Sequence, residues 1–270
     1  MTDSTFDRAL YQSRLRTRVL GRHLVACAEV SSTNDEAWNA LGVGAPVGAA
    51  FVADIQSAGR GREGREWRHA PGKGLALSVL LHQACDRREL GALPLVAGLA
   101  LSEALELLGA PAELEWPNDL MLHGRKVSGI LAESRSLPRH GDAAVIGVGV
   151  NVLQEPEDFP AEIASLATSL AMEGCRTTRE EVAAEFVNAL EPLLAELREG
   201  ARAAVLDRWR RRASFWDREV RANTPAGRVV GVARALDAEG GLVVERADGS
   251  RVTIVAGDVD VAPPRAPAVR

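Results

Sequence analysis

Apolar and polar positions follow two different patterns along the chain, and the change falls near residue 215. Before it, short apolar runs typical of buried strands are separated by segments with apolar residues at helical spacing. The predicted strands cover residues 22–29, 48–55, 75–81, 113–116, 120–122, 126–133 and 143–150. The predicted helices cover residues 3–20, 91–109, 178–199 and 201–212, and a further helix follows the hydroxyl-rich turn at 32–34. This mixture predicts an α/β domain over residues 1–215.

From residue 216 onward the chain consists of short β-like runs separated by turn signals. The runs cover residues 219–222, 228–235, 241–246 and 251–255, and residues 237–241 and 247–250 have the composition of hairpin turns. About 50 residues of such strands predict a small barrel over 216–270. The Pro/Ala-rich tail 263–270 is expected to fray.

Composition places the chain among soluble proteins. Of its 270 residues, 46% are hydrophobic and 26% are charged, which is typical of a globular protein. No membrane span is expected, because the longest apolar stretch, Leu90–Leu101, contains Gly and Pro and falls short of about 20 residues. No signal peptide is expected either, because the first residues are acidic and polar. Three widely spaced cysteines form no disulfide or zinc pattern, which favours the cytoplasm. A net charge of −5 disfavours a generic nucleic-acid binder.

Lysine is rare in this chain. Of 32 basic residues only Lys73 and Lys126 are lysine, and all the others are arginine. A coding bias towards Arg explains the trend, and chance explains two surviving lysines equally well. Lys is nevertheless a compact point charge that a planar guanidinium does not replace at a tight site. Both lysines are therefore candidates for chemistry.

A glycine- and arginine-rich loop between two predicted strands, residues 56–74, is the most informative segment. Gly59, Gly61 and Gly64 formally match G-x-G-x-x-G, which in dinucleotide-binding proteins requires a helix that opens at the third Gly. Here Pro71-Gly72 and another strand follow too closely for that helix. The dinucleotide interpretation therefore fails in its sequence context.

The same loop favours an anion site. Arg60, Arg62 and Arg65 alternate with glycines, which permit close backbone approach, and guanidinium forks match phosphate and carboxylate oxygens. The alternatives are a solvated basic loop or a nucleic-acid contact, and the acidic net charge weakens the second.

Five ordered motifs together resemble the biotin–protein ligases, over about residues 22–262. The combination is specific, because the related lipoate ligases are similar in fold but lack the Gly/Arg/Trp loop. The motifs are Ser32-Thr-Asn34, Gly59-Arg-Gly-Arg-Glu-Gly-Arg-Glu-Trp67, Trp116-Pro-Asn-Asp119, Arg125-Lys-Val-Ser-Gly129 and Gly147-Val-Gly-Val-Asn151.

The resemblance implies a fold and a two-step reaction. The fold is α/β (α+β), with a mixed, mostly antiparallel sheet and helices packed on one face, as in class II synthetases, followed by an SH3-like barrel. Biotin attacks the α-phosphate of ATP to give biotinyl-5'-AMP, with Mg²⁺ as the accompanying ion. The biotinyl group then passes to one lysine of an apo biotin carboxyl carrier protein. No tightly bound organic cofactor is expected.

The resemblance also assigns residues to roles. Lys126 and Arg62 are the catalytic candidates, and Asp119 is the tentative Mg²⁺ ligand. The biotin-binding candidates are Ser32, Thr33, Asn34, Gln56, Arg60, Gly61, Arg62, Lys126 and Gly129. The nucleotide-binding candidates are Arg65, Trp67, Asn118, Asp119 and Asn151. Lys73 is held as a second phosphate contact.

Structural interpretations stand beside several of these roles. Residues 32–34 are also compatible with a plain helix cap, and 118–119 with an Asx turn after Pro117. Trp67 either lines the adenine side or anchors a core. One departure from the family is Glu115, because many relatives have Lys at this position. If that lysine serves the nucleotide or the chemistry, its role must fall here on Lys73 or a loop arginine.

Several alternatives for partners and function remain open at this stage. About 30 residues precede Ser32, too few for the DNA-binding domain of bifunctional relatives, so we expect no operator binding. A homodimer through edge-strand pairing is compatible with the fold. The competing functions are a lipoate or other acyl-adenylate ligase, a biotin sensor that does not transfer the adenylate, and an NAD(P) oxidoreductase using the G-x-G-x-x-G match.

Overall fold

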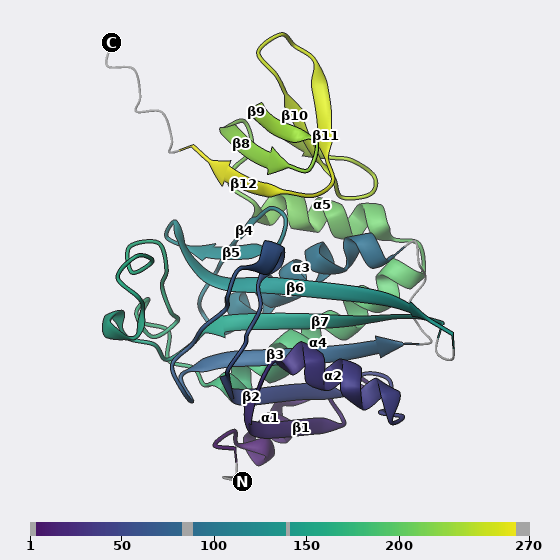
Figure 1. Cartoon of the computed structure of the whole chain (residues 1–270), viewed down its shortest axis with the longest axis vertical. Coiled ribbons are helices and arrows are strands. Elements are labelled where there is room, and N and C mark those ends of the chain that lie inside the picture. Colours follow the sequence, from purple (N-terminus) through teal and green to yellow (C-terminus); the bar gives the residue numbers. More distant parts are fainter. Residues whose placement is uncertain (1–3, 83–88, 139–140, 263–270) are drawn as a thin grey trace.

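The computed structural model describes residues 4–82, 89–138 and 141–262. They form a seven-stranded sheet covered by helices and a separate five-stranded sheet near the C-terminus (Figure 1). The larger sheet has the strand order β1-β2-β3-β7-β6-β5-β4. Its strands are β1 (Leu24–Val30), β2 (Ala50–Gln56), β3 (Gly74–His82), β4 (Glu113–Glu115), β5 (Asp119–Leu122), β6 (Arg125–Leu137) and β7 (Gly141–Asn151).

The predicted mixed, mostly antiparallel sheet is confirmed. β1 and β2 run parallel, and every other neighbouring pair in the sheet is antiparallel. β6 and β7 are longer than their apolar runs predicted, and they stay paired from Ser128↔Val150 to Leu137↔Gly141. The polar residues at the far ends of these strands are held by ladder hydrogen bonds rather than by burial.

Helices cover both faces of the large sheet, so the expectation of helices on one face was wrong. α3 (Leu93–Leu107) and α4 (Arg179–Arg198) share the main core with alternate strand residues such as Val52. α2 (Thr33–Gly42) packs Trp38 on the opposite face, in a second core that contains Phe51. Successive strand residues point to opposite faces, so β2 serves both cores. Figure 1 shows α2 in front of the sheet and α3 and α4 behind it.

The predicted helix over residues 3–20 is mostly absent, since α1 covers only Arg8–Arg14. The backbone N–H groups of residues 18–20 donate instead to the Glu191 carboxylate of α4, at 2.6–2.8 Å. The Arg16 N–H donates to the Asn188 side chain at 2.7 Å. Since α4 supplies these acceptors, the segment needs no helical hydrogen bonds of its own.

The apolar segment Leu90–Leu107 belongs to the core. By length and hydropathy it is the one described helix that resembles a membrane span, but 67% of it is buried inside the molecule. A mostly buried helix of this kind is what the centre of a globular domain requires.

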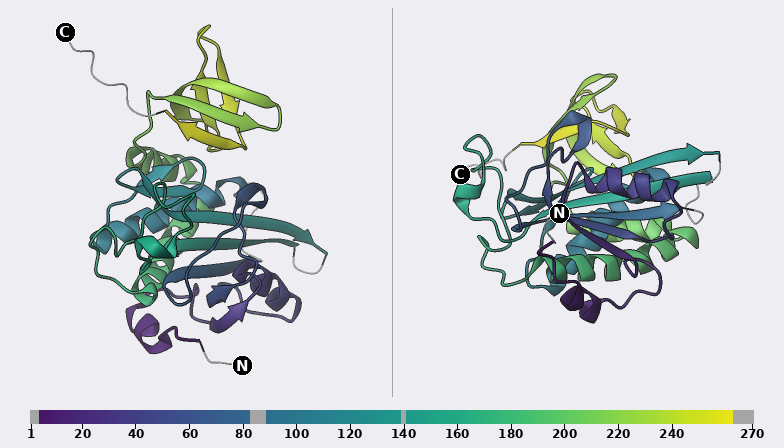
Figure 2. Two further views of the ribbon diagram at one scale, coloured as in Figure 1. Left: turned by 60° about the vertical axis from the view of Figure 1, so that its left-hand side comes forward. Right: turned by 60° about the horizontal axis from the view of Figure 1, so that its bottom comes forward.

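The second sheet is antiparallel, with the order β11-β10-β9-β8-β12, and corresponds to the small barrel predicted from the short strands. β12 was missed in the sequence, because four residues with two aspartates give a weak strand signal. The Trp116 indole of the large sheet's turn donates to the Gly240 carbonyl at 3.0 Å. This sheet sits above α5 (Figure 2). Its strands are β8 (Glu219–Thr224), β9 (Gly227–Leu236), β10 (Leu242–Glu245), β11 (Arg251–Ile254) and β12 (Asp258–Val261), and α5 covers Arg202–Arg212.

Candidate active site

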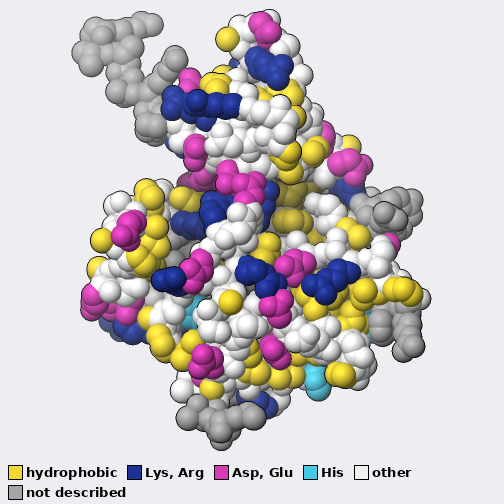
Figure 3. Space-filling view, in the orientation of Figure 1, with side chains coloured by type: hydrophobic (Ala, Val, Ile, Leu, Met, Phe, Trp, Pro, Cys, Tyr) yellow, Lys and Arg dark blue, Asp and Glu magenta, His cyan; other side chains and the backbone are white. Residues whose placement is uncertain are grey.

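A cavity of about 700 Å³ opens on the face of the large sheet that α2 covers only in part. Its walls come from the start of α2, the loop 56–74 and the segment 154–167. In Figure 1 that loop rises from β2 across the front of the sheet. Figure 3 shows basic side chains intermixed with carboxylates across the middle of this face, below the C-terminal sheet.

Small residues on adjacent strands make the floor of the cavity. Gly147, Gly149 and Asn151 of β7 alternate in sequence and therefore share one face. They pair in register with Ser78, Ala76 and Gly74 of β3. Four residues along a strand span about 13 Å. The floor thus has two ends and a middle, and each glycine leaves room for a side chain above it.

Two side chains fill that room closely. A Cβ atom on Gly147 would lie 2.3 Å from Asn34 Oδ1. A Cβ on Gly149 would lie 2.3 Å from the Trp67 indole, and one on Gly129 would lie 3.4 Å from it. Glycine is therefore required at 147 and 149 by close approach of a neighbour. Trp67 lies in the middle of the cavity rather than in the apolar core, and its indole N–H is buried without a partner.

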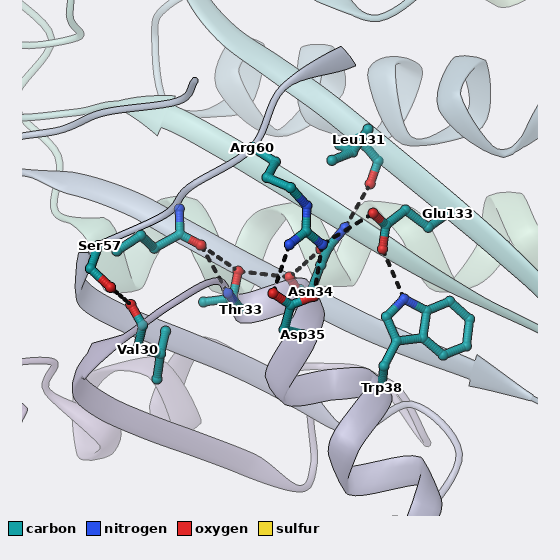
Figure 4. Close-up of polar contacts among 11 residues, drawn as sticks. Val30, Thr33, Asn34, Asp35, Trp38, Ser57, Arg60, Leu131 and Glu133 are labelled. Atoms are coloured by element: carbon teal, nitrogen blue, oxygen red, sulfur yellow. Dashed lines mark hydrogen bonds and ion pairs between the residues drawn. The ribbon is translucent and has the colours of Figure 1, made fainter. Parts of the chain in front are cut away.

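A hydrogen-bond network closes the Gly147 end. The Thr33 N–H donates to Gln56 Oε1 at 2.9 Å, and the Ser78 hydroxyl lies 2.6 Å from Asn34 Oδ1 and 2.7 Å from Thr33 Oγ1. Figure 4 shows Thr33 and Asn34 of this network at the start of α2. Ser32 occupies the N-cap position of α2 but makes no side-chain capping bond. The helix-cap interpretation is therefore right for the position of Ser32 but not for a side-chain capping bond, and the side chains of residues 32–34 line the cavity wall.

Sequence reasoning missed Ser78 in this network. Ser78 is fully buried, and it is the only polar residue between Gly74 and His82 of β3. A lone hydroxyl in a buried apolar strand needs hydrogen-bond partners, and that need is a readable signal.

Arg60 ties the loop to α2 and β6. Its guanidinium contacts the Asp35 carboxylate at 2.6 and 2.8 Å and the Glu133 carboxylate at 3.2 Å (Figure 4). Glu133 also accepts from the Trp38 indole at 2.8 Å. The hydrogen bond from Arg60 lowers the pKa of Asp35. Two carboxylates neutralise Arg60, so its main effect is to position the loop.

The other loop arginines reach different partners. Arg62 Nη1 donates to Asn118 Oδ1 at 3.1 Å, and Asn118 Nδ2 donates to the Ile130 carbonyl at 2.8 Å. Arg65 instead pairs with Asp258 of β12 at 2.5 Å. Arg62 is thus free of any carboxylate among the described ion pairs and adds positive charge to the cavity wall.

Lys126 lies at the start of β6, beside the middle of the floor. Its Nζ atom is 2.5 Å from Asp119 Oδ2 and 6.0 Å from the centre of the Trp67 ring. Its backbone pairs with the segment 166–168. The ammonium group therefore lies between the two ends of the cavity, where its positive charge can contact a ligand bound at either end.

Asp119 does not line the cavity itself, and it reaches the site through Lys126. Its Oδ1 atom is buried without a partner. Among the described residues no group of three His, Cys, Asp or Glu is placed to hold a metal ion. Mg²⁺ held mostly by phosphate oxygens needs only one or two carboxylates. Asp119 is one such carboxylate, but it would have to leave its pair with Lys126 to reach a metal ion in the cavity.

Glu115 faces Asp119 across the β4–β5 pair. Burial, with a smaller contribution from the nearby Asp119 charge, raises the pKa of Glu115 to about 7, although Lys126 and Arg218 act to lower it. Glu115 also lines a recess of about 280 Å³ between the two sheets, with Arg218 and Asp260. The Glu115 carboxyl is therefore only partly ionised near pH 7, where an ordinary glutamate is fully ionised.

Glu115→Gln should stabilise the protein at pH 8 and change it little at pH 4. An acid whose pKa is raised on folding destabilises the native state once the unfolded chain ionises, so the penalty grows between pH 4.5 and about 7. The gain is at most about 3 kcal/mol, reduced by partial exposure. Melting temperatures at both pH values measure it. Glu113→Gln, an exposed carboxyl on the same strand, is the control, and an equal gain at pH 4 and pH 8 contradicts the interpretation.

The Gly74 end contains two buried amides. Asn151 Nδ2 donates to the Thr168 carbonyl at 3.0 Å, and Gln154 Nε2 donates to Asn151 Oδ1 at 3.0 Å. Lys73 does not line the cavity, because it pairs with Asp158 at 2.6 Å. Gln154 was not foreseen in the sequence, since it follows the last recognised motif by three residues.

The structure thus brings nearly all the predicted site residues to one cavity. Besides Asp119, which lies behind Lys126, every one of them lines it: Ser32, Thr33, Asn34, Gln56, Arg60, Gly61, Arg62, Arg65, Trp67, Asn118, Lys126, Gly129 and Asn151. No α-helix opens at Gly64, where the backbone makes only a three-residue 3₁₀ turn. The dinucleotide interpretation fails on structure as it did on sequence.

The fold and the cavity define an enzyme-like site, in which Lys126 lies between two polar ends that can each bind a ligand. Two family models match the chain: the biotin/lipoate A/B protein ligase family over residues 26–151 and the biotin protein ligase C-terminal domain over residues 216–261. The bifunctional ligase/repressor BirA of Bacillus subtilis is 32% identical over 249 residues, covering 92% of this chain and 76% of that protein.

Other relatives agree. The biotin–[acetyl-CoA-carboxylase] ligase of Mycobacterium tuberculosis is 34% identical over 272 residues, covering 96% of this chain and 98% of that protein. The structure of the biotin protein ligase from Aquifex aeolicus in complex with biotin and ATP superimposes with a TM-score of 0.74 at 30% identity, covering 90% of this chain and 100% of that one. The chain belongs to the biotin protein ligase family.

Proposed function

We propose that this protein activates biotin with ATP to biotinyl-5'-AMP and transfers the biotinyl group to a lysine of an apo biotin carboxyl carrier protein. The observation that carries the proposal is the position of Lys126, the one lysine that lines the cavity. It lies between the Gly147 end and the Gly74 end, and both ends are lined by polar side chains. The named activities of the relatives and the biotin and ATP complex of the Aquifex protein support it.

In the first step a biotin carboxylate oxygen attacks the α-phosphorus of ATP, and the bond to the β-phosphate breaks to release pyrophosphate. Two anions must approach each other, so a fixed positive charge near both lowers the barrier. Lys126 fills this role, because its ammonium stands in the middle of the cavity and its flexible stem can follow the carboxylate. Arg62 adds a second charge from the loop.

The two ends divide the ligands. Thr33, Asn34 and Gln56 offer amide and hydroxyl groups that suit the polar ring of biotin at the Gly147 end. Trp67 covers the middle of the floor, where its indole lies flat over Gly149. The nucleotide then extends toward Asn151. Asn118 and Asp119 stand on the phosphate side, where Mg²⁺ supplies charge to the triphosphate when bound, with Asp119 as its protein ligand.

In the second step the amine of the carrier lysine attacks the acyl carbon, the bond from that carbon to the phosphate oxygen breaks, and AMP leaves. The mixed anhydride hydrolyses readily, so the site must exclude water until the carrier arrives. The loop 56–74 lies over the cavity and is pinned by Arg60. We assign the ligase chemistry to residues 1–215, with 216–270 as the smaller domain, and place it in the cytoplasm.

Biotin-dependent exchange of labelled pyrophosphate into ATP tests the first step. Exchange that requires biotin and Mg²⁺, and that lipoate does not support, is the expected result. Exchange with lipoate alone would favour the other branch of the matched family. The absence of exchange with either acid would overturn the proposal.

Arg62→Gly should weaken retention of the adenylate. The substitution removes the contact with Asn118 and one positive charge from the loop, so biotinyl-5'-AMP escapes faster. Labelling of a bystander protein, relative to the carrier, should rise by about tenfold. The exposed Arg211→Gly on α5 is the matched control, and an unchanged ratio of bystander to carrier labelling would refute the role of Arg62.

A further inference from the structure

Residues 59–67 of the glycine- and arginine-rich loop fold back on themselves as a small hairpin, which we call the loop lobe. The Trp67 N–H donates to the Gly59 carbonyl at 2.9 Å, and the Gly61 N–H donates to the Arg65 carbonyl at 2.7 Å. A Cβ atom on Gly59 would lie 2.3 Å from the Trp67 carbonyl oxygen, so the two arms are closely packed. The lobe therefore moves as a unit, with Gly59 and Trp67 at its base.

The base of the lobe is firmly held to the large sheet and to α2. Arg60 donates two hydrogen bonds to Asp35 and a third to Glu133. The Trp67 indole lies directly on Gly149. Three charge-assisted hydrogen bonds and one close packing contact must break before the base can leave the cavity.

The tip of the lobe, residues 62–65, is mostly exposed and is held by fewer contacts. Among the described residues, two hydrogen bonds tie it to other elements. Arg62 donates to Asn118 at 3.1 Å, and Arg65 Nη2 donates to Asp258 Oδ1 at 2.5 Å. The side chains of Arg65 and Asp258 are 55% and 31% exposed, so water competes for this ion pair. The tip should therefore detach before the base does.

The second sheet holds Asp258 in a fixed position at the start of β12. Its backbone pairs with Asn223 of β8. A Cβ atom on Gly257 would lie 2.3 Å from the Asn223 carbonyl oxygen, so the chain is packed against β8 just before Asp258. Val259 and Val261 pack on the main core, and the alternation of strand residues turns Asp258 to the other face of β12. The acceptor for Arg65 is thus anchored in a different sheet from the cavity.

We propose that Asp258 is a positioning residue for the ligase reaction: through Arg65 it holds the tip of the loop lobe over the cavity, so that the C-terminal sheet controls how often the loop opens. The inference rests on the proposed function and goes beyond it by naming a group outside the cavity that governs closure. When the ion pair breaks, the lobe turns about its Arg60 base and the cavity opens on the side of the second sheet. Arg65 then serves closure rather than nucleotide binding.

Asp258→Ala separates closure from chemistry, because it leaves Lys126 and Arg62 in the cavity. Single-turnover formation of biotinyl-5'-AMP at saturating biotin and ATP should stay within about twofold of wild type. Release of the adenylate should rise about two- to fivefold, which is what one partly exposed ion pair can supply. Arg65→Gln breaks the same pair from the lobe and should have the same effect, and the double variant should release the adenylate no faster than either. High salt should speed release from wild type but not from the variants.

Limited proteolysis of the ligand-free protein measures opening of the lobe without any turnover. Glu-C protease cuts after glutamate, and Glu63 lies at the tip without taking part in the ion pair. Cleavage at Glu63 should be about two- to fivefold faster in Asp258→Ala, because the rate follows the population of the open form. Exchanging the charges in Arg65→Asp/Asp258→Arg should restore the wild-type rate. Asp207→Ala, which breaks an ion pair with Arg211 inside α5, is the matched control.

An unchanged cleavage rate at Glu63 in an Asp258→Ala variant that melts normally overturns the inference. Faster cleavage that the charge exchange does not reverse overturns it as well, and so does unchanged release of the adenylate. If the wild-type protein failed to activate biotin while the cleavage rates changed as expected, the proposed function would be rejected and the role of Asp258 in holding the lobe would stand.

Discussion

Lys126→Ala lowers the rate of biotin adenylation by about 10²- to 10³-fold, the usual cost of removing one fixed donor from developing negative charge. Lys126 is the only lysine that lines the cavity, and Trp67 and Asp119 hold its ammonium near the middle of the floor. Single-turnover formation of biotinyl-5'-AMP measures the effect on chemistry directly.

The fold should survive this substitution. The Lys126–Asp119 pair is about one-third exposed, with side-chain exposures of 32% and 26%, and such pairs contribute at most about 1 kcal/mol. Lys126→Arg keeps the charge but replaces a compact ammonium with a planar fork, so we expect it to restore only part of the rate. The exposed Arg211→Ala is the control. Wild-type turnover in Lys126→Ala would refute the assignment.

Gly147→Ala and Gly149→Ala should damage different parts of the cavity. At 147 the new methyl would lie 2.3 Å from Asn34 Oδ1 and displace the network with Ser78, so the KM for biotin should rise by about tenfold or more. At 149 the methyl would push Trp67 off the floor, so the KM for ATP should rise more than that for biotin.

Gly42→Ala is the matched control for both substitutions, because nothing lies within 4 Å of a Cβ built at that position near the end of α2. Steady-state kinetics with each substrate varied in turn separates the two effects. If both glycine variants raised both KM values equally, the assignment of biotin to the Gly147 end and of nucleotide to the Gly74 end, where Asn151 lies, would be wrong.

The local signals in the sequence were sufficient for the strands of the large sheet, whereas the residues of the cavity came from the resemblance to the biotin–protein ligases. Alternation and apolar runs located β2, β3 and β7 to within a few residues, because the core requires those positions to be apolar. The prediction of a helix over residues 3–20 was wrong, because the Glu191 carboxylate, far away in the sequence, accepts backbone hydrogen bonds that a helix would have made internally. Local periodicity contains no information about such a partner.

Roles were harder to predict than positions. Arg60 looked like an anion ligand, but Asp35 and Glu133 neutralise it, and both pairings depend on the tertiary fold. For Trp67 the sequence is compatible with both the core and the cavity. The structure places its indole directly on Gly149 in the cavity, where any Cβ atom would collide with it. Gln154 was not predicted, because its place in the cavity depends on hydrogen bonds that link it through Asn151 to the distant Thr168 carbonyl.

Transfer of biotin to a carrier lysine tests the central proposal most directly. The purified protein is incubated with biotin, ATP, Mg²⁺ and an apo biotin carboxyl carrier domain, and the intact mass of the carrier is followed. The account predicts one biotinyl addition on one carrier lysine, absent with lipoate and nearly lost in Lys126→Ala. Biotin activation without any transfer, or full transfer by Lys126→Ala, would contradict it.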